Sequence, residues 1–206
     1  MNHHVVMTPT TNCYLDLYQG DPAIEPPTYS RLTLSDCYDF DPVPKGINDS
    51  TLILGGQGNL WTESVPNYRQ AEYMTWPRAF ALAEVFWSPK ATKNWVSFIH
   101  RTEQHLKRFE QRDVNFARSF YDAIILPYKE KQGPLKVKLD TEIEGLKIYY
   151  SFDSTYPDHH SPLYRNDETL TPPKNADTFR VITYRDDKPL GRIITVSLAE
   201  LAKRVK

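Results

Sequence analysis

The amino-acid sequence predicts an α/β region followed by an all-β region. Up to about residue 126, short β-prone runs are followed by Gly or Pro and then by long amphipathic stretches, a pattern typical of α/β folds. After Pro127 the apolar residues alternate at a period of two in short segments, as in half-buried antiparallel strands. With 206 residues the chain is long enough for two small domains. We therefore expect one domain over residues 1–126 and another over residues 127–206.

The first region is expected to contain short strands and two long helical stretches. The β-prone runs are residues 3–7, 13–17 and 51–54. A helical stretch over residues 68–87 should kink or split at Pro77, because proline lacks the backbone N–H that the helix needs. A second helix over residues 94–111 has an apolar stripe at helical spacing, which indicates core packing and no ligand platform. The stripe consists of Trp95, Phe98, Ile99, Thr102, Leu106 and Phe109.

A long polar loop over residues 19–46 separates the second and third β-prone runs. It is rich in proline and too irregular to predict a helix of any length. Loops of this size inside compact domains tend to be functional. The alternative is a simple surface excursion, and the sequence leaves both interpretations open.

The second region is predicted to be a small antiparallel β-sandwich. Turn-forming clusters at residues 153–162 and 166–174 separate its alternating segments. The residues expected to share inward faces are Leu135, Val137 and Leu139; Leu146, Ile148, Tyr150 and Phe152; Phe179 and Val181; and Ile193 and Thr195. His159 and His160 lie in one of the turn clusters, where a solvated pair is more common than a metal site.

Composition excludes several classes of function. There are 25 basic and 26 acidic residues, so a net charge of −1 provides no field that attracts nucleic acid. No segment approaches the roughly 18 consecutive apolar residues of a membrane span, and a hydrophobic fraction of 40% argues against disorder. Cys13 and Cys37 form neither a disulfide framework nor a zinc-ligand cluster. We expect no metal, no cofactor, no nucleic-acid partner and no membrane span.

Two pairs of side chains are candidates for binding or catalysis. Tyr14 and Asp16 are two residues apart, as are Trp61 and Glu63, so each pair would share one face of a strand. If both strands belong to a parallel barrel, their carboxyl ends open onto one mouth. An aromatic face with carboxylates suits a sugar, which has an apolar C–H surface and hydroxyl donors. The alternative is that Trp61 fills a barrel layer and Glu63 caps the following helix.

A longer string of residues carries a family resemblance. Residues 55–63 read GGQGNLWTE, and Glu72-Tyr73-Met74, Pro77-Arg78 and residues 83–88, AEVFWS, follow in order. This combination resembles the retaining β-N-acetylhexosaminidases of glycoside hydrolase family 20. Upstream, residues 7–9 and 13–16 look like the seventh barrel strand of the family, and residues 40–44 look like the loop that follows. Downstream, residues 148–164 are similar to the β-sandwich appended to many bacterial members.

The resemblance implies a fold and an activity. It implies that residues 1–126 are the last two βα units of a (β/α)8 TIM barrel. The activity would be hydrolysis of terminal non-reducing N-acetyl-β-D-hexosamine residues from oligosaccharides or glycoconjugates, with the substrate's own acetamido oxygen as nucleophile. By resemblance Tyr14 is catalytic, since it would hold that oxygen in line for attack. Asp16 and Glu63 would bind sugar hydroxyls around O6 and O4, and Trp61 would stack on the sugar ring.

One departure from the family is large. The adjacent Asp-Glu pair that supplies the general acid belongs to the fourth barrel strand in the family, and no counterpart is found in this sequence. Asp167-Glu168 falls in a turn cluster of the second region and is interpreted as a solvated pair. We therefore expect a truncated C-terminal piece that is inactive alone and associates with an N-terminal part of the barrel. No signal peptide is found, although the family resemblance suggests a periplasmic or extracellular location.

Two non-catalytic functions remain as alternatives for the β-rich region. Tyr149, Tyr150, Tyr156 and Tyr164 could bind glycans as an accessory module, although tyrosines in alternating strands more often pack in a core. The region could instead be purely structural and stabilise the last barrel helix.

Overall fold

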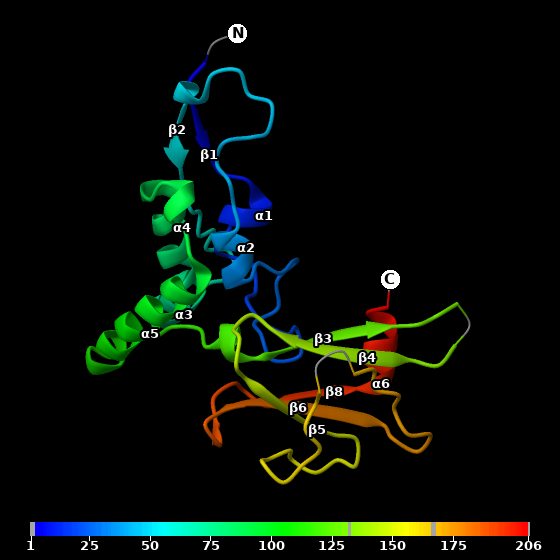
Figure 1. Cartoon of the computed structure of the whole chain (residues 1–206). Helices are drawn as coiled ribbons and strands as arrows, with labels where there is room; N and C mark the ends of the chain where they lie inside the picture. Colours follow the sequence, from blue (N-terminus) through cyan, green and yellow to red (C-terminus); the bar gives the residue numbers. More distant parts are fainter. Residues whose placement is uncertain (1–2, 132, 166–167, 206) are drawn as a thin grey trace. The chain divides into compact units, whose positions relative to one another are not determined.

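The computed structural model describes residues 3–131, 133–165 and 168–205 and forms two compact units (Figure 1). The first unit contains residues up to Gln19 together with Pro26–Ala117, and the second contains Gly20–Glu25 together with residues from Arg118 onward. The expected boundary between residues 126 and 127 is wrong, because it would cut strand β3 (Ala123–Tyr128). Every residue of β3 is paired with β4 (Lys136–Thr141), so the two strands belong to one unit.

The first unit is built around a short parallel pairing. Strand β1 (Val5–Met7) pairs with β2 (Ile53–Gly56), and backbone hydrogen bonds extend the pairing beyond both strands (Figure 1). The amide of Asn59 donates to the carbonyl of Cys13 at 2.8 Å, and the amide of Leu15 donates to the carbonyl of Asn59 at 2.7 Å. Residues 57–59 therefore run beside residues 13–15, and the parallel alignment reaches the region of the predicted site.

The predicted strand over residues 13–17 is wrong. Thr10–Cys13 form the short helix α1, and the following residues make only isolated bridges, at Tyr14 and Tyr18. Burial nevertheless alternates residue by residue from Cys13 to Gln19, which explains why the sequence resembles a strand. The run over residues 51–54 begins as the 3-10 turn η1 (Ser50–Leu52), so only its last two residues belong to β2.

Helices make up most of the rest of this unit. Helix α3 (Tyr68–Thr75) and helix α4 (Arg78–Trp87) are separated at Pro77, as predicted. After the turn η2 (Lys90–Thr92), helix α5 (Trp95–Gln111) follows and buries most of the predicted stripe. The loop over residues 19–46 differs from expectation, because it contains the short helix α2 (Leu34–Tyr38). A capping box between Thr33 and Asp36 starts this helix, and such local hydrogen bonds stabilise even a five-residue helix.

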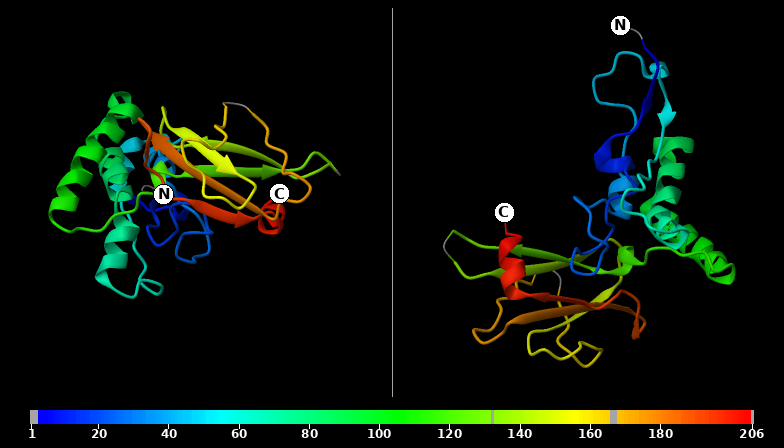
Figure 2. Two further views of the ribbon diagram at one scale, coloured as in Figure 1. Left: turned by 90° about the horizontal axis from the view of Figure 1, so that it is seen from below. Right: turned by 180° about the vertical axis from the view of Figure 1, so that it is seen from behind.

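The second unit consists of two antiparallel sheets that enclose one hydrophobic core (Figure 2). One sheet is β3–β4. In the other, β6 (Thr178–Arg185) pairs with β5 (Lys147–Ser151) along one edge and with β7 (Lys188–Pro189) and β8 (Ile194–Ser197) along the opposite edge. The turn η3 (Ser119–Tyr121) precedes β3, and helix α6 (Leu198–Lys203) follows β8. The core includes Ile125, Val137, Leu139, Ile148, Phe179, Val181, Ile194, Val196 and Leu201.

The inward face predicted for the last strand is wrong by one residue. Ile194 and Val196 are buried, whereas Thr195 is exposed and Ile193 is only half-buried. A shift of one residue reverses every side chain of a strand, and Val196 lies opposite the buried Phe179 in the register of β8 and β6. Of the other predicted inward residues of this region, five are buried as expected, namely Val137, Leu139, Ile148, Phe179 and Val181. The remaining four are only half-buried, namely Leu135, Leu146, Tyr150 and Phe152.

Buried ion pairs anchor residues 20–25 in the second unit. The guanidinium of Arg192 lies 2.5 Å from Oε1 of Glu25 and 2.6 Å from Oδ2 of Asp122. The carboxyl groups of Glu25 and Asp122 are almost inaccessible, at 0% and 2% exposure. Arg204 pairs with Asp21 at 2.9 Å. Gly20 allows this close packing, since a Cβ there would lie 2.9 Å from Nη2 of Arg192.

The buried Asp122 should make the stability of the chain depend on pH. Burial raises the pKa of Asp122 from 3.8 to about 6, although the hydrogen bonds and charge of Arg192 oppose the shift. Between about pH 4 and pH 6 the folded chain therefore binds more protons than the unfolded chain, and the free energy of unfolding falls as the pH rises. In Asp122→Asn this component, about 3 kcal/mol, should be absent. Urea unfolding at several pH values measures the pH dependence of the free energy of unfolding, and Asp186→Asn, at an exposed position, is the control. If this free energy varied with pH equally in wild type and in Asp122→Asn, the prediction would be contradicted.

Candidate functional site

The first unit contains a pocket of about 250 Å³, which we call the Trp61 pocket. It is lined by Asp16, Thr28, Tyr29, Trp61, Glu63 and Ser64. Three of the four predicted site residues are in this lining. The fourth, Tyr14, is adjacent, because the centroids of the Tyr14 and Trp61 rings are 6.2 Å apart. The structure thus brings all four predicted side chains together.

The backbone pairing described above places these side chains. Tyr14 forms a parallel bridge with Asn59, two residues before Trp61, so the two segments emerge side by side. The geometry differs from the two strand ends that the sequence predicted. Tyr14 and Asp16 are half-buried between buried neighbours, as on a strand, but residues 61–63 are irregular and all exposed. Trp61 and Glu63 therefore reach the same pocket through the irregular path of the backbone after Asn59. They do not share one face of a strand.

Trp61 and Glu63 both lie at the surface of the described unit, in the pocket lining. Trp61 is 51% exposed, so it does not fill a core layer of the described unit. The helix that follows begins at Tyr68, and its N-cap is Asn67, whose side chain accepts a hydrogen bond from the amide of Gln70. Glu63 therefore does not cap it, and both side chains are available at the pocket.

Arg78, at the start of α4, fixes the backbone that carries Asp16. Its side chain is fully buried and donates hydrogen bonds to four carbonyl oxygens, those of Leu15, Leu17, Leu32 and Met74, at 2.6–2.9 Å. The carbonyls of Leu15 and Leu17 lie on either side of Asp16 in the sequence. Residues 15–17 have no continuous strand partner, and the guanidinium of Arg78 holds them in an extended form. Hydrogen bonds from a charged donor are stronger than those from a neutral one.

The carboxylate of Asp16 is only partly satisfied within the chain. The hydroxyl of Tyr29 donates to Oδ2 of Asp16 at 3.2 Å. Oδ1 is buried and has no hydrogen-bond partner among the described residues. A buried acceptor without a donor is costly, and it belongs here to a carboxylate that lines the pocket. Burial, followed by the charge of Asp16, raises the pKa of the Tyr29 phenol.

Thr28, Tyr29 and Ser64 line the pocket and were not among the predicted site residues. Ser64 directly follows Glu63 and could have been found by extending the motif. Thr28 and Tyr29 belong to the loop over residues 19–46, whose length was the available signal. The structure shows that part of this loop contributes to the pocket lining, which favours a functional interpretation of that part.

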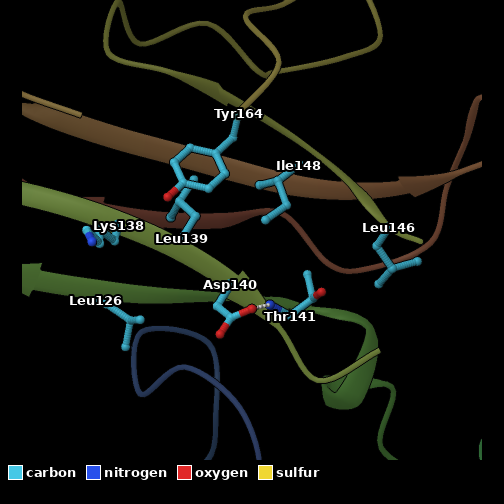
Figure 3. Close-up of a pocket in the computed structure, with 8 residues that line it drawn as sticks. All are labelled: Leu126, Lys138, Leu139, Asp140, Thr141, Leu146, Ile148 and Tyr164. Atoms are coloured by element: carbon cyan, nitrogen blue, oxygen red, sulfur yellow. Dashed lines mark hydrogen bonds between the residues drawn. The ribbon is translucent and has the colours of Figure 1, made fainter. Parts of the chain in front are cut away.

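A larger cavity of about 360 Å³ lies in the second unit (Figure 3). Its lining combines apolar side chains with Lys138, Asp140, Thr141 and Tyr164. Most of these polar groups already have partners. The hydroxyl of Tyr164 donates to the carbonyl of Glu168, the hydroxyl of Thr141 donates to the carbonyl of Ile143, and Asp140 accepts the amide of Thr141. The Trp61 pocket, with an unpartnered acceptor, is the better candidate site.

Other titratable groups do not form a site in the described part of the chain. No group of three or more His, Cys, Asp or Glu side chains is placed there to hold a metal ion, and no described helix is long and apolar enough to cross a membrane. His159 and His160 lie side by side in an exposed turn. Asp167 of the Asp-Glu dipeptide lies outside the described residues, and the carboxylate of Glu168 accepts the backbone amide of Arg165.

Comparison with known protein families connects this pocket to a class of enzymes. Residues 1–90 match the sequence profile described as glycosyl hydrolase family 20, catalytic domain. This segment of the chain is similar to the family 20 catalytic domain. All six residues that line the Trp61 pocket fall within the matched segment. Residues 137–198, in the second unit, match a profile described as Fn3 associated.

Curated relatives and solved structures show the same similarity. A beta-hexosaminidase of Porphyromonas gingivalis is 32% identical over 80% of this chain and 22% of its own length, and one from Akkermansia muciniphila is 32% identical over 52% and 22%. The chain thus spans about a fifth of the length of these relatives. A Vibrio harveyi exo-beta-N-acetylglucosaminidase, solved with N-acetylglucosamine, matches 55% of this chain and 18% of its own at 31% identity and a TM-score of 0.51. A Streptomyces plicatus N-acetyl-beta-hexosaminidase matches 56% and 24% at 25% identity and a TM-score of 0.52.

Removing the Arg78 guanidinium should destabilise the first unit strongly. Arg78→Leu leaves four buried carbonyl oxygens without these donors, and we expect the free energy of unfolding to fall by roughly 3–5 kcal/mol. Urea denaturation followed by tryptophan fluorescence measures this loss. Arg108→Leu, on the exposed face of α5, is the matched control and should change stability by less than about 0.5 kcal/mol. A loss below about 1 kcal/mol in Arg78→Leu would show that the carbonyls find other donors.

Proposed function

We propose that this chain is part of a β-N-acetylhexosaminidase and that the Trp61 pocket is part of its sugar-binding site. The observation that carries the proposal is the convergence of Tyr14, Asp16, Trp61 and Glu63 at one pocket within the segment that matches family 20. The substrates would be oligosaccharides or glycoconjugates that end in a β-linked N-acetylhexosamine. The names of the curated relatives and the N-acetylglucosamine bound to the Vibrio harveyi enzyme support this class of substrate.

The four side chains provide complementary contacts for such a sugar. The exposed indole of Trp61 offers a flat apolar surface for the C–H face of the ring. Asp16 and Glu63 provide carboxylate acceptors for hydroxyl groups, and both side chains line the pocket. Together these groups would hold the terminal sugar in a defined orientation, which is the prerequisite for in-line chemistry.

Tyr14 has the proposed catalytic role. In substrate-assisted hydrolysis the acetamido oxygen attacks the anomeric carbon while a general acid protonates the leaving oxygen, and water then opens the resulting oxazolinium ion. The Tyr14 hydroxyl would donate to the acetamido oxygen and keep it aligned for attack. The carboxyl groups that line the pocket are those of Asp16 and Glu63, and both are assigned to hydroxyls. We therefore place the general acid on a part of the enzyme other than this pocket lining.

The proposed fold context is a larger barrel. We propose that β1 and β2 are the last two strands of a (β/α)8 barrel and that the second unit is a β-sandwich appended to it. Val5, Val6 and Leu54 on these strands are 42–64% exposed, which suits a sheet that is continued and covered by further elements. The partner of this surface would be the N-terminal part of the barrel.

The alternative of a glycan-binding second unit has little support from its tyrosines. Tyr149 and Tyr164 are buried and Tyr150 is half-buried, so their rings are core or sheet-packing groups. Tyr156 is exposed, but the guanidinium of Arg180 lies 4.4 Å from the centroid of its ring. A structural role for the second unit is therefore the simpler proposal.

Binding of N-acetylglucosamine to the 206-residue chain tests the proposed function. We expect weak, saturable binding in a titration that observes the NMR signals of the sugar, and its loss in Trp61→Ala, because the stacking surface is gone. Trp87→Ala is the matched control, since Trp87 is 88% exposed and does not line the pocket. No saturation in the wild-type chain would contradict the proposal.

The chain alone should hydrolyse a chromogenic N-acetyl-β-glucosaminide at least about 10²-fold more slowly than a complete β-N-acetylhexosaminidase. It lacks an assigned general acid, and general-acid catalysis contributes about 10²–10⁴-fold. Release of the chromophore measures the rate. Robust turnover would refute the proposal that the general acid lies outside this pocket lining.

A further inference from the structure

Tyr29 is held at the tip of a fixed turn beside the Trp61 pocket. The amide of Tyr18 donates to Oγ1 of Thr28 at 3.1 Å and to the carbonyl of Ser30 at 3.2 Å. The amide of Leu32 donates to the carbonyl of Tyr18 at 2.9 Å, and Tyr18 forms a bridge with Arg31. Residues 28–32 are thus fixed to Tyr18 on both sides of Tyr29. The position of the Tyr29 ring, which is 70% exposed, follows from this backbone and not from burial.

The phenol of Tyr29 meets a carboxylate whose backbone is equally fixed. Arg78 binds the carbonyls of Leu15 and Leu17, so the intervening Asp16 is held from behind. The Tyr29 hydroxyl then occupies Oδ2 of Asp16 and leaves the buried Oδ1 without a partner among the described residues. The two oxygens of a carboxylate are chemically equivalent, and here the phenol makes them different.

We propose that Tyr29 is a positioning residue that orients the Asp16 carboxylate so that this carboxylate accepts a hydroxyl of the bound sugar. This inference rests on the proposed sugar-binding function of the Trp61 pocket. The phenol restricts rotation about the Cβ–Cγ bond of Asp16, and the carboxylate is therefore oriented before the ligand arrives. Preorganised acceptors bind more tightly because less conformational freedom is lost on binding.

The phenol is suited to this role across the physiological pH range. Burial and the charge of Asp16 both raise the pKa of Tyr29, and Tyr14 and Glu63 act in the same direction. The Tyr29 hydroxyl therefore stays protonated and able to donate at neutral pH. If Tyr29 contacted the sugar only through its ring, the hydroxyl would be dispensable, and this difference makes the two roles separable.

A double-mutant cycle on the 206-residue chain tests the proposal, with N-acetylglucosamine as the probe and the Trp61 indole as the NMR signal. Tyr29→Phe removes the hydroxyl and keeps the ring, and we expect the Kd to rise about tenfold, the effect of one hydrogen bond to a charged group. In the Asp16→Asn background the same substitution should change the Kd by less than about twofold, because Tyr29 acts through Asp16. Tyr68→Phe, at an exposed tyrosine of the same unit, should match the wild type.

Two results would overturn the proposal while leaving the sugar pocket intact. One is an unchanged Kd in Tyr29→Phe. The other is a tenfold loss that persists in the Asp16→Asn background, which would mean that the hydroxyl acts on the ligand directly. Failure of the wild-type chain to bind the probe is a different result, since it would refute the sugar pocket and this inference with it.

A second measurement, the pKa of Tyr29, needs no ligand. If the Tyr29 ring had only a structural role, this pKa would not depend on Asp16. With ¹³C-labelled tyrosine, the pKa of Tyr29 should fall toward its ordinary value in Asp16→Asn, because the carboxylate charge and its hydrogen bond are removed. An identical titration of Tyr29 in both proteins would show that the contact with Asp16 is not maintained in solution. That result would overturn the inference independently of any sugar binding.

Discussion

Four backbone carbonyl oxygens converge on the buried guanidinium of Arg78, and the candidate site depends on this one arrangement. Residues 15–17 lack a continuous strand partner, so their extended form has to be stabilised from elsewhere. The helix that begins at Arg78 supplies that stabilisation, and its position is set in turn by the break at Pro77. Helix α4 therefore fixes the backbone of Asp16, which lines the pocket, although no residue of this helix is part of the pocket lining. A rigid support of this kind allows the pocket-lining segments themselves to be irregular.

Periodic elements could be predicted from the sequence, and elements fixed by distant contacts could not. Helix α5 and strands β4 and β6 were predictable because one face of each is buried. The alternation over residues 13–19 gave a false strand, because burial on one side of an extended segment produces the same pattern without a ladder. Strand β3 was missed because it contains Pro127. That proline is tolerated opposite Val137, whose own amide and carbonyl are paired with Leu170 and therefore require nothing from Pro127.

The candidate site shows the same division. Tyr14, Asp16, Trp61 and Glu63 were found from short spacings and a family motif, and the structure gathers them at one pocket. Tyr29 was not found, because its approach to Asp16 depends on pairing between Tyr18 and residues 28–32, which no periodicity indicates. The chemistry of the pocket is thus largely local in sequence. The orientation of the Asp16 carboxylate depends instead on contacts between residues that are distant in the sequence.

The ion pairs of residues 20–25 have a consequence for how such proteins can be rearranged in evolution. Asp21 and Glu25 come from the amino-terminal part of the chain, yet they neutralise Arg204 and Arg192 of the β-rich unit. A gene fusion that transferred only the codons from residue 118 onward would carry both arginines without these acidic partners. The β-rich unit is therefore not a free-standing cassette, and inheritance together with the segment that completes it should be favoured over independent shuffling.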